Sequence, residues 1–274
     1  NIGTFNADVD WGDGTVETIT AYDGFSHEYA DIDDHTITIT GTFPNIYFNN
    51  GGDKGKIKKV TSLGTVGWTR LNGAFRGCTN LTEFTVGTTD ISGVTDMTTM
   101  FRNCSGLTSL DLSSLDVSSL TTTYQMFYFC TGLTSLNLSG FVTTASLNTV
   151  YQMFNGCSGL TSLDVSSFNT SGVTTLQQMF QGCSGLTSVV GVEDFNITGL
   201  NSTGSLTSFL TGGKMTTAQY DALLVKWEAQ ASGIPAMTPS FGTSTYTGGG
   251  AAATARQDLI DIDGWSISDG GIAP

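Results

Sequence analysis

Two histidines are the only side chains of this 274-residue chain whose ordinary pKa suits a general base at neutral pH. His27 and His35 both lie near the N-terminus, and the sequence has no Gly-x-Ser-x-Gly nucleophile turn. A Ser-His-Asp site needs one of these bases beside an activated serine. We therefore expect both histidines to be structural and the chain to be no enzyme.

Carboxylates offer two other kinds of chemistry. Asp111 and Asp164 occupy equivalent positions two units apart in an internal repeat, so stacking would separate them by about 10 Å or more. Nothing predicts their burial, which disfavours a glycosidase pair. Asp8, Asp10 and Asp13 are a weak calcium candidate, because calcium takes six to eight oxygen ligands and their spacing is not that of an EF-hand. Turn-forming, solubilising acids are favoured there, and we expect no cofactor.

Five cysteines recur at one phase of the repeat, at intervals of 26, 26, 27 and 26 residues: Cys78, Cys104, Cys130, Cys157 and Cys183. Equivalent side chains of stacked repeats point the same way. A disulfide needs Cβ atoms about 3.8 Å apart, whereas stacked strands repeat at about 4.8 Å. The pattern favours a buried ladder of free thiols over disulfides or a metal site.

The elements that position these residues follow from the same period. Each unit reads Leu-x-x-Leu-x-Leu, then a polar turn, then a segment that ends in Met-Phe-x-x-Cys. The Leu-x-Leu part alternates with period two and predicts a short strand. The segment before Met-Phe has helical spacing, as from Met97 to Phe101 and from Val150 to Phe154. A strand and a short helix per unit predict a curved leucine-rich-repeat solenoid.

The text around Met179-Phe180 and 182–188 resembles the 26-residue repeat of BspA-like bacterial surface proteins. Similar text recurs around the earlier cysteines, and the resemblance covers roughly residues 56–212. It implies an extracellular leucine-rich-repeat adhesin or recognition module. It implies neither an enzyme nor a cofactor.

The two ends of the chain differ from the repeats. Residues 1–52 are predicted to form a β-rich cap that resembles a polycystic-kidney-disease-like segment, through Trp-Gly-Asp-Gly at 11–14 and His-x-Tyr at 27–29, with a half-buried strand over 36–40. The repeats are assigned to residues 53–212. Residues 213–274 are predicted to form a C-terminal cap with helices over 217–229 and 251–260 and a strand over 264–268.

Composition limits the partners. The net charge is −14, and only 12% of residues are charged. This argues against nucleic acid and against an anionic membrane surface as partners, because both need clustered bases. The sequence has no apolar run of 18 residues, so we expect no membrane insertion. Low lysine with abundant Ser, Thr, Gly and Asn is typical of secreted or virion-exposed proteins, so we expect an extracellular chain on a bacterial surface or a virion.

Three surfaces could bind a partner. The first comprises outward rows of the concave strand face: Ser109, Asp111, Ser135, Asn137, Ser162 and Asp164. The second carries exposed aromatic and basic residues: Arg76, Arg102, Tyr124, Tyr128 and Tyr151. The third is a row of threonines four residues after each cysteine, such as Thr134 and Thr161, which either orders water for ice binding or forms hydroxyl ladder bonds. The strand rows are equally consistent with solvated surface.

These observations predict a non-enzymatic recognition or adhesion module that binds a protein or carbohydrate receptor on another cell. The alternatives are a phage tail-fibre tip for host recognition, an ice-binding protein and a glycan hydrolase. The ligand, the oligomeric state and the mode of anchoring do not follow from the sequence.

Overall fold

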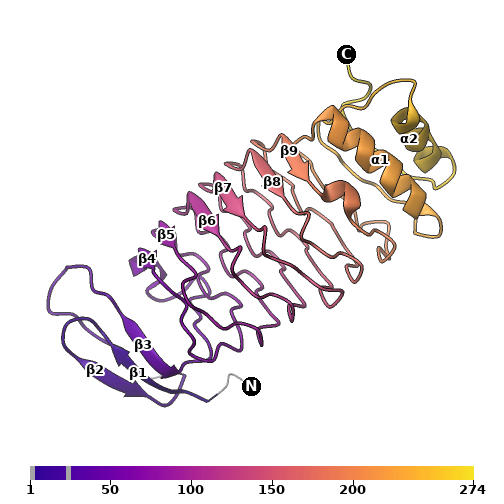
Figure 1. The fold of residues 1–274 in the computed structure, drawn as a ribbon. Coiled ribbons are helices and arrows are strands. Elements are labelled where there is room, and N and C mark those ends of the chain that lie inside the picture. Colours follow the sequence, from indigo (N-terminus) through magenta and orange to yellow (C-terminus); the bar gives the residue numbers. More distant parts are fainter. Residues whose placement is uncertain (1–3, 23–25) are drawn as a thin grey trace.

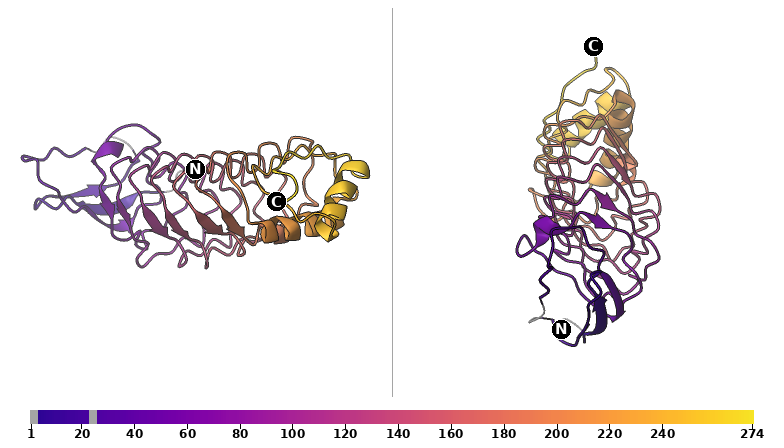
Figure 2. Two further views of the ribbon diagram at one scale, coloured as in Figure 1. Left: turned by 90° about the horizontal axis from the view of Figure 1, so that it is seen from above. Right: turned by 90° about the vertical axis from the view of Figure 1, so that its left-hand side faces the viewer.

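Each repeat forms one coil, and successive coils lie on top of one another along a single axis (Figure 1). The computed structural model describes residues 4–22 and 26–274. Short strands follow one another along one side of this stack, while irregular segments close the other sides (Figure 2). The repeat fold expected from the sequence is therefore present.

The strands are two or three residues long, because each coil gives only one inward side chain to the sheet between two outward ones. They are β4 (Lys59–Val60), β5 (Glu83–Phe84), β6 (Ser109–Asp111), β7 (Ser135–Asn137), β8 (Ser162–Asp164) and β9 (Ser188–Val190). Parallel pairing joins β4 to β5, β6 to β7 and β8 to β9, with Leu110 opposite Leu136. The central leucine of β6, β7 and β8 is buried and its two neighbours are exposed.

The prediction of a short helix in each repeat is wrong. The Met-Phe-x-x-Cys segments are turns, bounded by two residues with positive φ, such as Gln125 (54°) and Phe129 (56°). A left-handed residue breaks an α-helix. Alternate backbone N–H groups point to the next coil instead, so Phe127 N–H donates to the Met153 carbonyl at 2.9 Å. The apolar residues have the spacing of a helix because the tight turn directs side chains inward at similar intervals.

The predicted thiol ladder is confirmed. All five cysteines are free and buried, and each thiol from Cys104 onward donates to a phenylalanine carbonyl of an earlier coil, as Cys130 Sγ does to Phe101 O at 3.0 Å. Burial raises the pKa of the Cys78, Cys130 and Cys183 thiols to about 12. At neutral pH the ladder is therefore protonated and does not act as a nucleophile.

A column of phenylalanine rings runs beside the thiols. Phe101, Phe127 and Phe154 stack with ring centroids 5.7 and 5.5 Å apart and planes within 4° of parallel. All three are fully buried. Offset stacking of aromatic rings adds to the gain from burying their area, so this column fixes the rise from one coil to the next.

The N-terminal segment is a three-stranded antiparallel sheet with the order β2-β1-β3: β1 (Asn6–Asp10), β2 (Val16–Ile19) and β3 (Thr38–Thr42). The half-buried strand expected over 36–40 begins later and is mostly exposed. The stack starts at residue 43, within the segment assigned to the cap, because Phe43 N–H donates to the Val66 carbonyl at 2.8 Å. A short 3-10 helix, η1 (Lys54–Lys56), precedes β4.

A short 3-10 helix, η2 (Val192–Asp194), follows β9, and the C-terminal segment contains α1 (Thr217–Ala231) and α2 (Ala251–Asp261). The helix α1 begins where a capping box is formed between Thr216 and Gln219, and it packs beside β9 where the next strand would stand (Figure 1). It thereby covers the strand edge that a parallel ladder leaves unpaired. The strand predicted over 264–268 is only a single bridge from Ser240 to Ser268.

Neither helix in the described part of the chain is long and apolar enough to cross a membrane.

Candidate interaction surfaces

The strand face, formed by the outward residues of β4 to β9, uses its acids to make turns. Asp111 Oδ1 accepts hydrogen bonds from the backbone N–H and the hydroxyl of Ser113, at 2.9 and 2.6 Å, and Asp164 does the same with Ser166. Asn137 accepts from the backbone N–H of Ser139 at 3.1 Å. The hydrogen bonds from Ser113 lower the pKa of Asp111. Each of β6, β7 and β8 thus ends in an Asx turn, which the sequence encodes as Asp or Asn two residues before Ser.

The serines of the strand face stand beside these turns. Ser109 pairs with Ser135 in the parallel ladder, and Ser162 pairs with Ser188. Ser109, Ser135 and Ser162 are exposed. The predicted row is therefore present as a continuous surface of small polar side chains.

The structure gives no glycosidase geometry to the two aspartates of this face. β7 lies between β6 and β8, so Asp111 and Asp164 are two coils apart, and the buried rings of those coils step by 5.5 to 5.7 Å. Two such steps exceed the separation of roughly 5 to 9.5 Å that glycoside hydrolysis uses. Each carboxylate is also held by its own serine. The arrangement supports turn formation.

Threonines of the row four residues after each cysteine form hydroxyl ladder bonds, which is one of the two interpretations of this row. Thr134 Oγ1 donates to the Thr108 carbonyl at 3.0 Å, and Thr187 Oγ1 donates to the Thr161 carbonyl at 3.1 Å. The hydroxyl hydrogens are thus directed at the preceding coil. Three of the five hydroxyls of the row, on Thr82, Thr134 and Thr187, are used in this way.

The opposite surface, here called the turn face, consists of the outward residues of 95–105, 121–131, 148–158 and 174–184. An aromatic ridge formed by Tyr124, Tyr128, Phe129 and Tyr151 crosses two of these turns. The Tyr124 and Tyr151 rings stack at 5.3 Å, and the Tyr128 and Phe129 rings lie 4.7 Å apart. The Arg102 guanidinium lies 4.5 Å from the Tyr128 ring centroid, which is a cation–π contact.

A glutamine ladder, Gln125, Gln152 and Gln178, underlies this ridge and was not found from the sequence. Arg102 Nη1 donates to the Gln125 amide oxygen, the Gln125 amide donates to Gln152, and the Gln152 amide donates to Gln178. Tyr151 Oη donates to Gln178 Oε1 at 3.2 Å. The signal was available, because glutamine recurs two residues before phenylalanine in three successive repeats.

Arg76 lies on the same side of the stack, one coil before Arg102. Its Nη1 donates to Asn49 Oδ1 at 2.8 Å. No carboxylate of the described residues forms an ion pair with either arginine. The second predicted surface is thus brought together, with Arg76 at its margin.

The histidines of the N-terminal sheet are structural in their contacts. His27 stacks on Trp11 at 4.8 Å and hydrogen-bonds Asp13 at 2.7 Å, while Tyr29 Oη donates to the Trp11 carbonyl. The Trp-Gly-Asp-Gly and His-x-Tyr segments are therefore in contact. His35 hydrogen-bonds Asp31, which raises the pKa of the His35 imidazole.

The calcium candidate is not assembled. Asp8 accepts from the Thr18 hydroxyl, Asp10 from the Gly12 backbone N–H, and Asp13 from Thr15 as well as His27. Within residues 4–22 and 26–274, no three His, Cys, Asp or Glu side chains are grouped so that they could hold a metal ion. The three carboxylates serve local turns and strand contacts.

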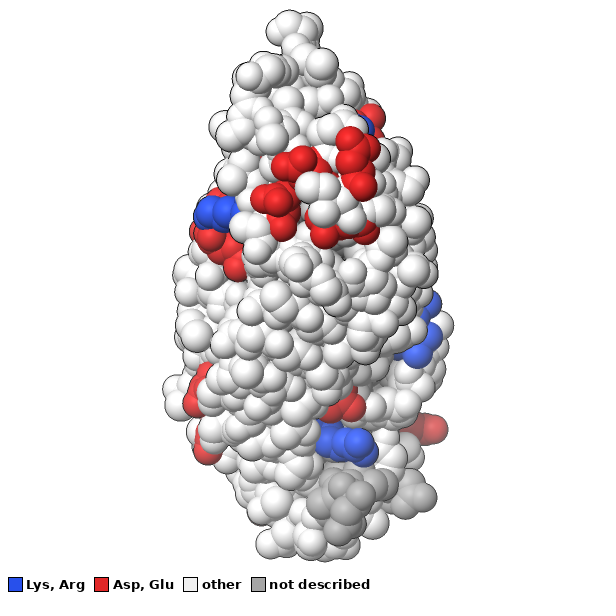
Figure 3. All heavy atoms as spheres, turned by 90° about the vertical axis from the view of Figure 1, so that its right-hand side faces the viewer, with Lys and Arg blue, Asp and Glu red and all other residues white. Residues whose placement is uncertain are grey.

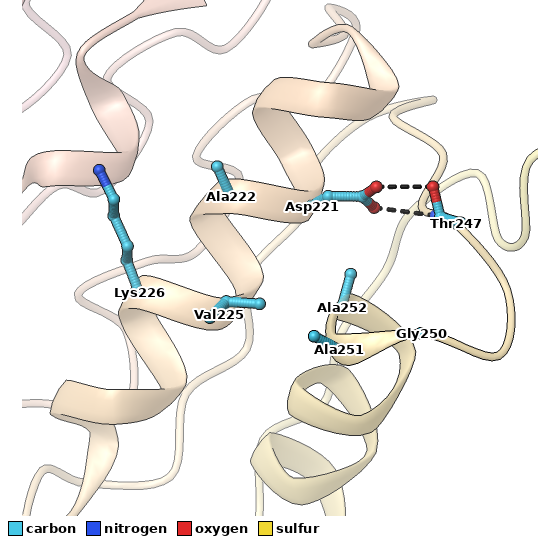
Figure 4. Close-up of a pocket in the computed structure, with 8 residues that line it drawn as sticks. All are labelled: Asp221, Ala222, Val225, Lys226, Thr247, Gly250, Ala251 and Ala252. Atoms are coloured by element: carbon cyan, nitrogen blue, oxygen red, sulfur yellow. Dashed lines mark hydrogen bonds between the residues drawn. The ribbon is translucent and has the colours of Figure 1, made fainter.

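A depression of about 410 Å³ lies between α1 and α2, lined by Val225, Ala251 and Ala252 among others. Figure 4 shows that Asp221 is occupied there, accepting from the backbone N–H and the hydroxyl of Thr247 at 2.8 and 2.6 Å. Lys226 points away from α2 and pairs with Asp194. The lining offers apolar surface with its polar groups already engaged, so it supports no chemistry.

Charge is unevenly distributed over the molecule. Acidic side chains gather on the end that carries the C-terminal helices (Figure 3). Seven of the ten bases fall between Lys54 and Arg102, and the turns at 121–131, 148–158 and 174–184 contain no acid and no base. The turn face therefore has a neutral or basic character in a chain of net charge −14.

Comparison with known families agrees with this architecture. Residues 127–222 match the BspA type leucine rich repeat region in six copies, and residues 47–158 match a family described as Mycoplasma protein of unknown function, DUF285. A search of curated proteins and a search of solved structures each found no match. The chain is a repeat protein whose coils form one stack. More particularly, residues 127–222 of this stack are similar to the BspA type leucine rich repeat region. Such regions are commonly surface-associated, take part in adhesion or recognition, and are generally non-enzymatic.

Proposed function

We propose that this chain is an extracellular, non-enzymatic recognition module that binds a receptor through the surface of its stacked coils. The observation that carries the proposal is the regular stack itself. Apolar side chains and thiols are directed inward, and each coil presents an equivalent set of outward side chains one step further along the axis. Repeat arrays use such extended surfaces for binding.

Three further observations support a binding role over a catalytic one. The aspartates that could have paired in catalysis are separated by two coils and hold their own turns. Both histidines lie between β2 and β3 in the sequence, where each stacks on an aromatic ring and is hydrogen-bonded to a carboxylate. Exposed tyrosines and an arginine, which are frequent contact residues, are gathered on the turn face.

An array experiment tests this proposal. The purified chain is displayed against printed glycans and extracellular proteins, and hits are measured by biolayer interferometry. We expect saturable binding to a defined target, which is lost when the chain is heat-unfolded. No saturable target on either array, or turnover of a labelled glycan library that Asp111→Asn abolishes, would contradict it.

A further inference from the structure

Phe129 keeps the backbone conformation of its position in the repeat but departs from the residue type that the other repeats use there. The residue before each cysteine has a positive φ, and at the other four cysteines it is glycine or asparagine: Gly77, Asn103, Gly156 and Gly182. Phe129 adopts the same left-handed conformation with φ of 56°. A bulky side chain is unfavourable there, whereas glycine and asparagine tolerate it.

The phenylalanine is also only partly used in packing. Its side chain is 45% exposed and its ring lies against Gly156, where an added Cβ would meet the ring at 2.8 Å. An exposed ring held in an unfavourable backbone conformation points to selection for contact with something outside the chain. Tyr124 beside it is 38% exposed.

The charge on this surface has no internal partner. The Arg102 guanidinium is held by Gln125 and Tyr128, and none of the described carboxylates pairs with it, although the chain has 24 acids and 10 bases. A guanidinium fixed by neutral groups is suited to an anionic group of a ligand, because its remaining Nη hydrogens, unlike the buried Nε–H, can form charge-assisted hydrogen bonds.

The size and polarity of the ridge decide between ligand classes. An aromatic side chain buries about 150 to 250 Å² when covered, so Tyr124 and Phe129 offer on the order of 150 to 200 Å². Each side of a stable protein interface buries about 800 Å². The surroundings are half-buried amides and a hydroxyl, on Gln152, Gln181 and Tyr151. Aromatic rings can pack against the C–H faces of sugars, and amides can hydrogen-bond sugar hydroxyls. This surface therefore fits an oligosaccharide better than a protein.

We infer that the aromatic ridge and Arg102 bind an oligosaccharide that carries a carboxylate or a sulfate group. The inference deepens the proposed function and rests on it. The rings contact the sugar and Arg102 binds its anionic group, while the glutamine ladder fixes the guanidinium in place.

The test uses the full chain on matched neutral, carboxylated and sulfated oligosaccharides, whose separate arms tell the two anions apart. We expect saturable binding to at least one anionic sugar and binding about tenfold or more weaker to its neutral counterpart. Arg102→Gln, which installs the residue of the equivalent position 181, should remove this preference. Phe129→Asn, which copies Asn103, should weaken binding about tenfold or more.

Val190→Asn is the matched control. Val190 is also 45% exposed, lies on the strand face, and becomes the residue found at the equivalent position 137. Its binding should stay within about twofold of wild type, and thermal melts should show all three variants folded.

Three results would overturn the inference while leaving the proposed function intact: equal binding of neutral and anionic sugars, an unchanged affinity in Phe129→Asn, or saturable binding to protein targets alone. The absence of any saturable target would reject both.

Discussion

The strand face and the turn face come from the same 26-residue unit, yet they differ in how far each side chain is committed to the fold. On the strand face the polar groups serve the backbone, as when Asp164 holds Ser166. On the turn face, large rings remain exposed, and Arg102 has no acidic partner among the described residues. The regularity of a repeat therefore says little about function by itself. The positions where a repeat departs from its own rule, such as Phe129, are more informative.

The largest expected effect concerns the thiols beneath the turn face. Their pKa is raised by burial, from 9.0 to about 12 for Cys78, Cys130 and Cys183, so folding favours the protonated form. Their contribution to stability is complete below pH 9 and is lost as the pH rises toward 12. We expect cooperative unfolding in this interval, measured by circular dichroism.

Thiol titration provides the control for that experiment. At pH 7.5, Ellman's reagent should react with none of the five cysteines of the native chain and with all five in denaturant. Fast reaction of the native chain would contradict the buried ladder.

The second largest effect lies beneath the strand face. Leu136→Ala leaves a cavity in β7 and should lower the free energy of unfolding by about 2 to 5 kcal/mol. Urea denaturation measures the loss, and Ser135→Ala, an exposed neighbour, should stay within about 0.5 kcal/mol of wild type. Equal effects of the two substitutions would mean that the inward and outward assignments are incorrect.

A smaller effect should follow from removing one Asx turn of the strand face. Asp164→Ala deletes two hydrogen bonds from Ser166 and should cost about 0.5 to 2 kcal/mol of unfolding free energy, while target binding stays unchanged. A loss of binding with unchanged stability would move the recognition site to the strand face.

The smallest change in stability is expected at Phe129. Phe129→Asn relieves an unfavourable φ but loses the contact with Gly156, so the unfolding free energy should lie within about 1 kcal/mol of wild type, on the stabilising side. Urea denaturation again gives the value. Destabilisation by more than this would show that the ring is retained for packing and would remove the difference between the two faces.

The sequence predicted the parts of the fold that depend on burial. Cysteine and phenylalanine recur at fixed positions in five repeats, which predicted that the thiols and the rings form columns. The apolar spacing of Tyr220, Leu223 and Trp227 predicted α1. It did not predict the turns, because two left-handed residues per unit leave the apolar spacing of a helix unchanged. Glycine at 156 and 182 was the available signal for them, and Phe129 concealed it in the third repeat.

The candidate surfaces were predicted as rows but not in their bonding. Spacing alone placed Asp111 and Asn137 side by side, as observed. It did not reveal that Asp111 turns back to Ser113, or that Gln125 joins Arg102 to the next coils. Such bonds depend on side-chain rotation within the assembled stack, which a row of residue types does not specify.

Covalent carbene footprinting of the chain with and without its saturating target tests the central claim most directly. If the turn face is the recognition surface, peptides covering 121–131 and 148–158 should be protected, and those covering β6, β7 and β8 should be labelled as in the free chain. Protection confined to the strands, with the tyrosines of the aromatic ridge still labelled, would contradict the account.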